Sequence, residues 1–237
     1  MSDFVLEFRD VQKAYGGLRP FRLQQLELSP AQTLALVGFD AAAAEVFVNL
    51  ATGAAVPDTG EVRVFGQSTT AITDAHAWLA SLDRFGIVSE RAVLLDALTA
   101  LQNLAMPLTL EVAPLAEDIR AQVTQLAGEV GIDIADLARP VAEFPPAARL
   151  RVRLGRALAL KPDVLLVEHP NALLRPEDLP AFSAAFTKIV AARGIASITL
   201  TADGSFAGSI AGTVLTLQPA TGVLKPTAGW RRWFAGR

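Results

Sequence analysis

Short apolar runs constrain the fold of this chain more than any other feature of the sequence. TLALVG (33–38), DVLLVEHP (163–170) and ASITLTA (196–202) are apolar with little alternation and are bounded by residues that break strands. Such runs are typical of strands buried on both faces of a parallel sheet. FVLEFRDV (4–11) and EVRVFG (61–66) alternate instead, as strands do when one face is exposed. The sequence therefore predicts two sheets of different kinds.

The pattern changes to helical spacing in the middle of the chain. LAEDIRAQVTQLAGEVGI (115–132) and RLRVRLGRALAL (149–160) repeat apolar residues every three or four positions. Between them, RPVAEFPPA (139–147) is interpreted as a loop broken by prolines. Further on, PEDLPAFSAAFTKIVAARG (176–194) is expected to form a helix before the last buried strand. This order predicts an α/β core with a helical subdomain inserted in it.

We expect one domain over residues 1–237, with the helical subdomain at about 93–157 and a C-terminal tail at 226–237. A chain of 237 residues with 51% hydrophobic and 19% charged residues can bury a large core. The formal net charge of -3 gives no large basic field, which argues against nucleic acid as a partner. The chain has no cysteine, so disulfides, thiolate catalysis and cysteine-bound metals are excluded.

No membrane span or secretion signal is expected. The first ten residues, MSDFVLEFRD, are charged and lack the apolar centre of a signal peptide. No apolar run reaches the roughly 18 to 20 residues that cross a bilayer. We therefore expect a cytoplasmic protein, positioned at the inner face of a membrane through a partner.

The order of the segments resembles the nucleotide-binding subunit of ATP-binding cassette (ABC) transporters from about Val5 to Leu217. The resemblance implies a P-loop NTPase-like ABC ATPase fold, with a parallel-sheet core, an antiparallel β subdomain and a helical subdomain. Besides a phosphate-loop-like segment, the matching landmarks are LEFRDVQKAYGG (6–17), GEVRVFGQ (60–67), RFGIVSERAVLLDALTALQNLAMPL (84–108) and EFPPAARLRVRLGRALALKPDVLLVEHPNALL (143–174). They resemble, in turn, the strand leading to the aromatic loop, a strand pair, the glutamine loop with its docking frame, and the signature through Walker B.

The segment that resembles a phosphate loop lacks the residues that hold phosphate. A loop of the form GxxxxGK[ST] uses glycines to turn backbone N–H groups inward, lysine to reach phosphates and a hydroxyl to bind magnesium. The matching stretch here is GFDAAAAE, in which Gly38 remains, Ala43 replaces the last glycine, Ala44 the lysine and Glu45 the hydroxyl residue. Charge-assisted hydrogen bonds contribute roughly 1.5 to 3 kcal/mol each. We therefore expect no cofactor, with ATP and magnesium binding only at low affinity.

The other positions that the resemblance marks as catalytic are substituted as well. The signature becomes FPPAA (144–148), where Pro145 and Pro146 cannot donate backbone hydrogen bonds. The remaining substitutions are Glu90 for the loop glutamine, Glu168 for the Walker B aspartate, His169 for the catalytic glutamate, Arg175 for the D-loop aspartate and Ala202 for the switch histidine. Loss of a general base alone typically slows a reaction by about 10² to 10⁴. No catalytic residue and no metal site are expected.

The alanine run predicts what the altered loop does, because alanine favours helix where glycine favours an open cradle. We expect the helix to begin early, with Asp40 capping its N-terminus and Glu45 in or near its first turn. The chain's own carboxylates would then occupy the end that otherwise binds phosphate. If any nucleotide binds, the resemblance places it against Tyr15, which would stack on adenine, and against the loop described above.

Several residues keep two interpretations. Tyr15 is either an adenine platform or an aromatic residue kept with the framework. Glu168 and His169 are either a metal or acid–base pair at the end of a buried strand or remnants of the site. His76 is expected at the surface. The tail GWRRWFAGR (229–237) suits either a membrane interface or protein groove, or packing on its own domain.

The arginines of the segment after the signature are expected mainly on a solvated helix face, with an anion site as the alternative. They are Arg149, Arg151, Arg153 and Arg156. Arg149 and Arg151 resemble basic positions that the family itself has.

The resemblance implies head-to-tail dimers in which each ATP lies between one phosphate loop and the other subunit's signature. Because both are altered here, neither composite site would be intact in any pairing. The leading hypothesis is a degenerate subunit, a structural or regulatory partner of a membrane transport complex. Its expected partners are a permease subunit, an intact ABC ATPase subunit, or both, through Glu90–Leu108. The alternatives are an ATPase that uses Glu168, His169 and Tyr15, and a nucleotide sensor.

Overall fold

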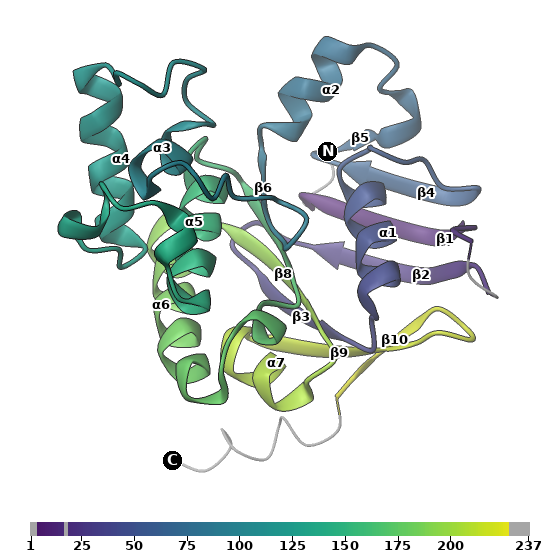
Figure 1. Ribbon diagram of the computed structural model, residues 1–237. Helices are drawn as coiled ribbons and strands as arrows, with labels where there is room; N and C mark the ends of the chain where they lie inside the picture. The colour runs from purple at the N-terminus through teal and green to yellow at the C-terminus, as the bar shows by residue number, and fades with distance from the viewer. Residues whose placement is uncertain (1–3, 17–18, 228–237) are drawn as a thin grey trace.

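The computed structural model describes residues 4–16 and 19–227 of the chain. Figure 1 shows an antiparallel sheet on one side of the molecule, a group of helices on the other, and a second sheet between them. The two predicted kinds of sheet are both present. Within the described ranges, no helix is long and apolar enough to cross a membrane.

The smaller sheet is antiparallel and has the strand order β2-β1-β4-β5. Its strands are β1 (Leu6–Lys13), β2 (Phe21–Leu28), β4 (Thr59–Val64) and β5 (Gln67–Ser68). The alternating segments of the sequence therefore lie where alternation predicted them, with one face of the sheet against the core.

The larger sheet has the order β10-β9-β3-β8-β7-β6 and is parallel from β9 to β6, with β10 antiparallel at its edge. Its strands are β3 (Thr33–Val37), β6 (Phe85–Val88), β7 (Val164–Glu168), β8 (Ala196–Thr201), β9 (Thr213–Gln218) and β10 (Val223–Pro226). The three continuous apolar runs form β3, β7 and β8, which lie next to one another. This arrangement explains why those runs do not alternate.

The helices cover both faces of the larger sheet, and α3 to α5 lie in the chain between β6 and β7. The proposed subdomain limits of 93–157 and the single-domain assignment stay predictions. The α-helices are α1 (Ala41–Ala51), α2 (Ala75–Leu82), α3 (Ala100–Ala105), α4 (Glu117–Glu129), α5 (Pro146–Leu158), α6 (Leu179–Arg193) and α7 (Gly204–Ile210). Short 3-10 turns occur at Thr69–Ala71, Ile134–Asp136, Val141–Glu143, Pro170–Leu173 and Pro176–Asp178.

Two helix starts differ from the sequence prediction. The supposed loop at 139–147 contains a 3-10 turn, and α5 begins inside it at Pro146. Proline is tolerated there because the first residues of a helix have no carbonyl to bond. The second difference is in the segment 176–194, which was expected to form one helix. It is α-helical only from Leu179, because a 3-10 turn precedes α6.

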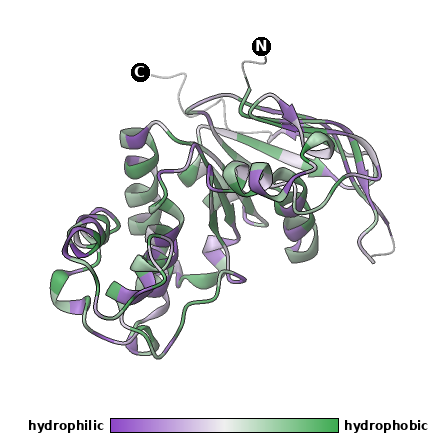
Figure 2. Ribbon diagram, turned by 90° about the horizontal axis from the view of Figure 1, so that it is seen from above, coloured by the Kyte–Doolittle hydropathy of each residue, from purple (hydrophilic) through white to green (hydrophobic). Residues whose placement is uncertain are grey.

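The core consists of two apolar clusters on opposite faces of the larger sheet. In β7, Val164 and Leu166 pack toward α1 and the antiparallel sheet, whereas Leu165 and Val167 pack toward the helical side. Figure 2 shows hydrophobic colour along the strands at the centre of the molecule. The carboxyl ends of β3, β8, β7 and β6 are thereby fixed side by side in that order, and the candidate site lies at these ends.

Candidate functional site

The loop after β3 turns directly into α1. Gly38 has φ of +94°, and a Cβ there would approach the carbonyl oxygen of Leu217 to 3.1 Å, so a side chain would be strained. α1 begins at Ala41, and the Oδ1 atom of Asp40 accepts a hydrogen bond of 2.7 Å from the Ala43 N–H. The early helix start and the Asp40 cap, both predicted from the alanine run, are confirmed.

The first turn of α1 offers no side chain to a phosphate. Ala44, at the position that resembles the lysine, is fully buried in the cluster between the two sheets, and Ala43 packs against the same cluster. The first turn contains no acidic residue. Glu45 is the fifth residue of the helix and thus lies near the first turn, as expected, but its ion-pair partner is an arginine.

That arginine is Arg91, which joins three parts of the chain. Its Nη2 donates to Oε1 of Glu168 at 2.5 Å and its Nε to Oε2 of the same carboxylate at 3.3 Å. Its Nη1 lies 3.2 Å from Oε1 of Glu45. Arg91 follows β6, Glu168 ends β7 and Glu45 lies on α1. A single guanidinium thus binds two carboxylates that come from different elements.

Sequence analysis missed Arg91. The available signal was indirect: two carboxylates, Glu45 and Glu168, stand at positions whose family counterparts face a cation. Arg91 directly follows Glu90 in the segment that resembles the glutamine loop, and it is the positive residue nearest to Glu90 in the sequence. The adjacency of β6 and β7 brings Arg91 to Glu168, and Glu45 reaches it from α1.

A cavity of about 560 Å³ surrounds this ion-pair group. It is lined by Phe39, Asp40, Ala41, Ala42, Glu45, Ser89, Glu90, Arg91, Glu168, His169, Ala172, Leu173 and Ala202. Glu90 and Ala202, named from the sequence, therefore reach the same place as Glu168 and His169. Four carboxylates face one arginine in this lining, a balance that disfavours a polyphosphate.

Glu168 and His169 are adjacent, and among the described residues no hydrogen bond joins their side chains. Both carboxylate oxygens of Glu168 accept hydrogen bonds from Arg91. His169 has φ of +43°, and its N–H donates to the Leu200 carbonyl at 2.8 Å. Its Nε2 is buried and has no hydrogen-bond partner within the described residues. In residues 4–16 and 19–227, no group of three or more histidine and acidic side chains is placed to hold a metal.

The segment that resembles the signature forms the start of α5. Pro145 is the residue before the helix and Pro146 the first residue within it. Both lack a backbone N–H, so two of the donors that a helix end normally presents are missing. The segment can stabilise the helix start, but it is poorly equipped to bind phosphate.

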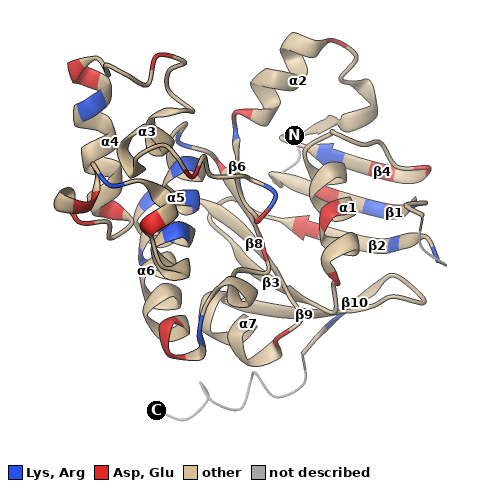
Figure 3. Ribbon diagram, in the orientation of Figure 1, with Lys and Arg blue, Asp and Glu red and all other residues tan. Residues whose placement is uncertain are grey.

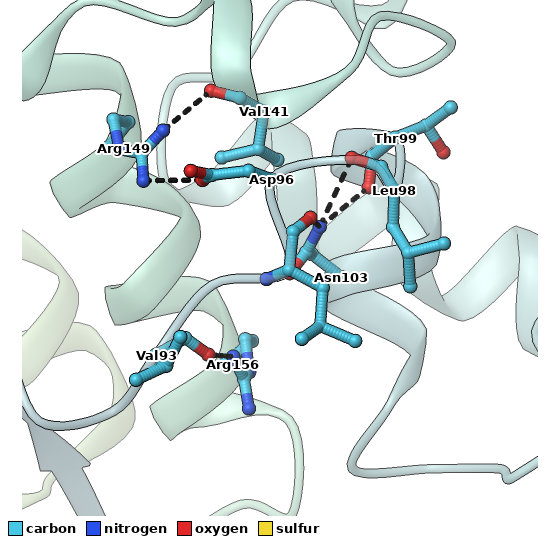
Figure 4. Close-up of polar contacts among 9 residues, drawn as sticks. Val93, Asp96, Leu98, Thr99, Asn103, Val141, Arg149 and Arg156 are labelled. Atoms are coloured by element: carbon cyan, nitrogen blue, oxygen red, sulfur yellow. Dashed lines mark hydrogen bonds and ion pairs between the residues drawn. The ribbon is translucent and has the colours of Figure 1, made fainter.

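Three of the α5 arginines anchor loops while their side chains stay partly exposed, so the expected solvated face also has a structural role. Figure 3 shows several basic positions on α5, and Figure 4 shows the contacts of Arg149 and Arg156. The Arg149 side chain binds the Asp96 carboxylate at 2.6 Å and the Val141 carbonyl at 3.0 Å. Arg156 donates to the Val93 carbonyl at 2.7 Å. On the other side, Arg151 donates to the Gly131 carbonyl at 2.7 Å.

Arg153 differs from its neighbours. Its Nε is buried and lacks a hydrogen-bond partner among the residues that the structure describes. Burial lowers the pKa of Arg153 from its usual value, and the positive charge of Arg149 lowers it further. Burial also lowers the pKa of Arg156.

The remaining predicted residues lie apart from the cavity. Tyr15 is partly buried against the core cluster of the antiparallel sheet, and no finding separates its two interpretations. His76 is exposed on α2, as expected. Arg175 is exposed and pairs with Glu177 and Asp178. The tail at 229–237 lies outside the described residues.

Comparison with known proteins identifies the family. The chain is 32% identical over 212 residues to the lipoprotein-releasing system ATP-binding protein LolD of Maricaulis maris, covering 88% of this chain and 92% of that protein. The chain belongs to the family of ABC transporter ATP-binding subunits. No family model matches the chain.

Other ABC relatives agree over most of the chain. The methionine import ATP-binding protein MetN of Brucella abortus is 29% identical over 214 residues, which cover 90% of this chain and 57% of MetN. The chain thus spans little more than half of MetN.

Solved structures confirm the ABC ATPase fold. CbiO1 of Clostridium perfringens, described as part of the ABC transporter complex CbiONQ, matches with a TM-score of 0.80 and 17% identity. That match covers 94% of this chain and 88% of CbiO1. The ATP-binding cassette MJ0796, solved as a dimer bound to ADP and Pi, matches with a TM-score of 0.77 and 19% identity over 94% of this chain and 99% of its own.

Proposed function

We propose that this chain is a catalytically degenerate ABC subunit, a structural or regulatory partner of a membrane transport complex with little or no ATP hydrolysis. The observation that carries the proposal is Arg91, held between Glu45 and Glu168. By resemblance these two positions face the magnesium ion of an active subunit. Here they bind a guanidinium of the same chain, which contacts both oxygens of Glu168 and one of Glu45 and would compete with a metal for them.

The surrounding positions support the same function. Ala44 is buried where a lysine would reach phosphate, and Pro145 and Pro146 remove N–H donors from the signature segment. His169 has its backbone in the left-handed region and Ala202 carries no base. Each change weakens a different part of phosphoryl transfer, which depends on positioning and charge stabilisation. Together they support a function with little or no hydrolysis.

The region Glu90–Leu108 is the proposed docking surface for a permease subunit, an intact ABC ATPase subunit, or both. Its loop exposes two large apolar side chains, Val93 at 66% and Leu95 at 43%. Beside it lies a cavity of about 250 Å³ whose lining includes Ala92, Pro107 and the arginines 153 and 156. Exposed apolar side chains next to a hollow are typical of protein interaction sites. LolD and MetN, by their names, each serve a transport or release system.

A second candidate function is an ABC subunit that binds ATP, either as a weak ATPase or as a nucleotide sensor. The cavity of about 560 Å³ favours it, because a ligand could enter beside Glu168 and His169. In this case Tyr15 would stack on the adenine.

Calorimetry with ATP separates these functions. The purified chain is titrated with ATP up to millimolar concentration, with and without magnesium, and its thermal unfolding is followed in parallel. The degenerate function predicts no saturable heat and no stabilisation by ligand. Saturable binding that is enhanced by magnesium, lost in Tyr15→Ala and retained in Tyr15→Phe would contradict it. A phosphate-release assay would then distinguish an ATPase from a sensor.

A further inference from the structure

The two carboxylates around Arg91 form a guanidinium site. Glu45 and Glu168 approach from α1 and from the end of β7, and they contact the nitrogens Nε, Nη1 and Nη2 of one side chain at 2.5 to 3.3 Å. Planar guanidinium groups suit this arrangement, because their fork of donors matches carboxylate geometry. We call these three residues the Arg91 clamp.

Burial makes the clamp more than a surface ion pair. The Glu168 side chain is only 8% exposed, whereas Arg91 is 41% and Glu45 49% exposed. A carboxylate as buried as Glu168 is costly unless a positive group binds it. The other charged groups lining the cavity are Asp40 and Glu90, both acidic. Within the cavity lining, Arg91 is thus the sole positive side chain available to Glu168.

The clamp lies at the start of the loop that leads to the docking surface. Arg91 follows β6 by three residues and precedes the exposed Val93 by two. Its N–H donates to the Ser89 hydroxyl at 3.1 Å, which fixes the turn out of the strand. The clamp therefore connects the core, through α1 and β7, to the first residues of the docking loop.

Further along, the same loop is held from the helical side. The Val93 carbonyl accepts from Arg156, the Asp96 carboxylate binds Arg149, and Asn103 bonds the loop backbone (Figure 4). The loop 89–98 thus has one anchor to the core and several to the helices α3 and α5. Without the clamp, its core end would keep the β6 strand pairing but lose the side-chain anchor that crosses to α1 and β7.

We infer that Arg91 acts as a built-in cation that locks the docking loop to the core with no ligand bound. The inference rests on the proposed function, because the clamp occupies the place where an active subunit would hold nucleotide and metal. It adds that the docking surface keeps the same conformation whether or not ATP is present. A partner would then meet a preorganised surface, which lowers the cost of binding.

Hydrogen exchange of the full chain without nucleotide tests the clamp. In Arg91→Ala, amides of the loop 89–98 exchange about tenfold faster or more, since charge-assisted hydrogen bonds of this kind are lost. Guanidinium ion at low millimolar concentration restores protection, whereas sodium at the same ionic strength does not. Arg175→Ala is the matched control, because Arg175 also pairs with two carboxylates, Glu177 and Asp178, but within an exposed loop. It leaves the loop 89–98 unchanged.

A second variant covers the case in which Arg91→Ala fails to fold because Glu168 is left charged and unpaired. Arg91→Ala combined with Glu168→Gln removes that charge, and the loop again exchanges faster than in the parent. Glu168→Gln alone has a larger effect than Glu45→Gln, because Glu168 accepts two of the bonds and is more buried. Unchanged exchange of the loop in the folded variants would overturn the inference, as would equal rescue by sodium.

The proposed function and the clamp can fail separately. ATP binding by the parent protein would contradict the proposed function, whatever the exchange of the loop. Hydrogen exchange of the loop 89–98, measured without nucleotide, tests whether the Arg91 clamp holds the loop, whatever the affinity of the protein for ATP. If the parent binds ATP and ATP changes the protection of the loop 89–98, then the claim that the docking surface is independent of nucleotide is also wrong.

Discussion

Asp40 shows how a single side chain occupies a helix end. Its carboxylate accepts the Ala43 N–H at 2.7 Å, which satisfies one of the free donors of the first turn of α1. In a phosphate loop those donors would face the ligand. The cap therefore contributes to stability and occupies one N–H group that could otherwise donate to an anion.

The cap leads to a stability prediction. Asp40→Ala should lower the free energy of unfolding by about 1 kcal/mol, the usual value for an N-cap. Urea unfolding followed by circular dichroism measures the change, with the slope m expected to stay constant. Asp40→Asn is the control, because asparagine caps almost as well and should cost much less. Equal losses in both variants would show that the charge of Asp40, and not its capping bond, matters.

At the residue scale, the sequence predicted contacts that depend on near neighbours and missed those that depend on topology. The cap by Asp40 needs only the residues that follow it, and it was correct. The ion pair of Glu45 was missed because its partner, Arg91, lies 46 positions away and reaches it only after the sheet forms. The substituted positions, such as His169, were identified from the resemblance, but the buried Nε2 of this histidine was not foreseeable.

Among the structural elements, α3 has a special part because it holds the docking loop through Asn103. This side chain is fully buried, accepts from the Leu95 N–H at 2.9 Å and donates to the carbonyls of Leu95, Leu98 and Thr99. The helix itself is stabilised by a capping box between Thr99 and Gln102. A short helix is thus fixed at its start, and its asparagine determines the shape of the loop before it.

Loss of this asparagine should be severe. Asn103→Ala leaves the Leu95 N–H without its acceptor and takes one donor from the carbonyls of Leu95, Leu98 and Thr99, which keep their backbone donors. The free energy of unfolding should therefore fall by about 1 to 3 kcal/mol. Chemical denaturation measures the loss, and hydrogen exchange should show the loop 89–98 opening first. Gln122→Ala, an exposed position on α4, should change stability by no more than about 0.5 kcal/mol. A small effect of Asn103→Ala would mean that water replaces its bonds.

The strands and long helices were predictable because their periodicity reflects burial, as β7 shows with apolar side chains packed on both faces. The boundaries of these elements were less predictable from the sequence. The start of α5 at Pro146 was misjudged because two adjacent prolines were taken as a break, although the second one suits the first helical position. The arginines of α5 were assigned to solvent because their acceptors, mostly backbone carbonyls, leave no mark in the sequence.

For the whole molecule, the altered surfaces predict the response to nucleotide. In an active family member, by resemblance, ATP bridges the phosphate loop of one subunit and the signature of the other. Here the first turn of α1 lacks the lysine, and Pro145 and Pro146 begin α5. Sedimentation of the purified chain should therefore give the same mass distribution with and without magnesium and ATP.

An ATP-dependent shift toward dimer would contradict this prediction. The control for the assay is the parent chain with ADP, which would not be expected to bridge two subunits in the same way. A dimer that forms equally with and without nucleotide would agree with the prediction and would indicate an interface that does not include the cavity around Arg91.

The burial of Ala44 has an evolutionary consequence. A return to phosphate binding by Ala44→Lys alone would place an ammonium group in a fully apolar cluster beside Phe47, which is costly without a partner. Removal of Glu45 or Glu168 alone would instead leave Arg91 partly unpaired. Each single reversion thus passes through a less stable intermediate. To place a lysine at this position without such a loss of stability, several substitutions around α1 would have to be made together.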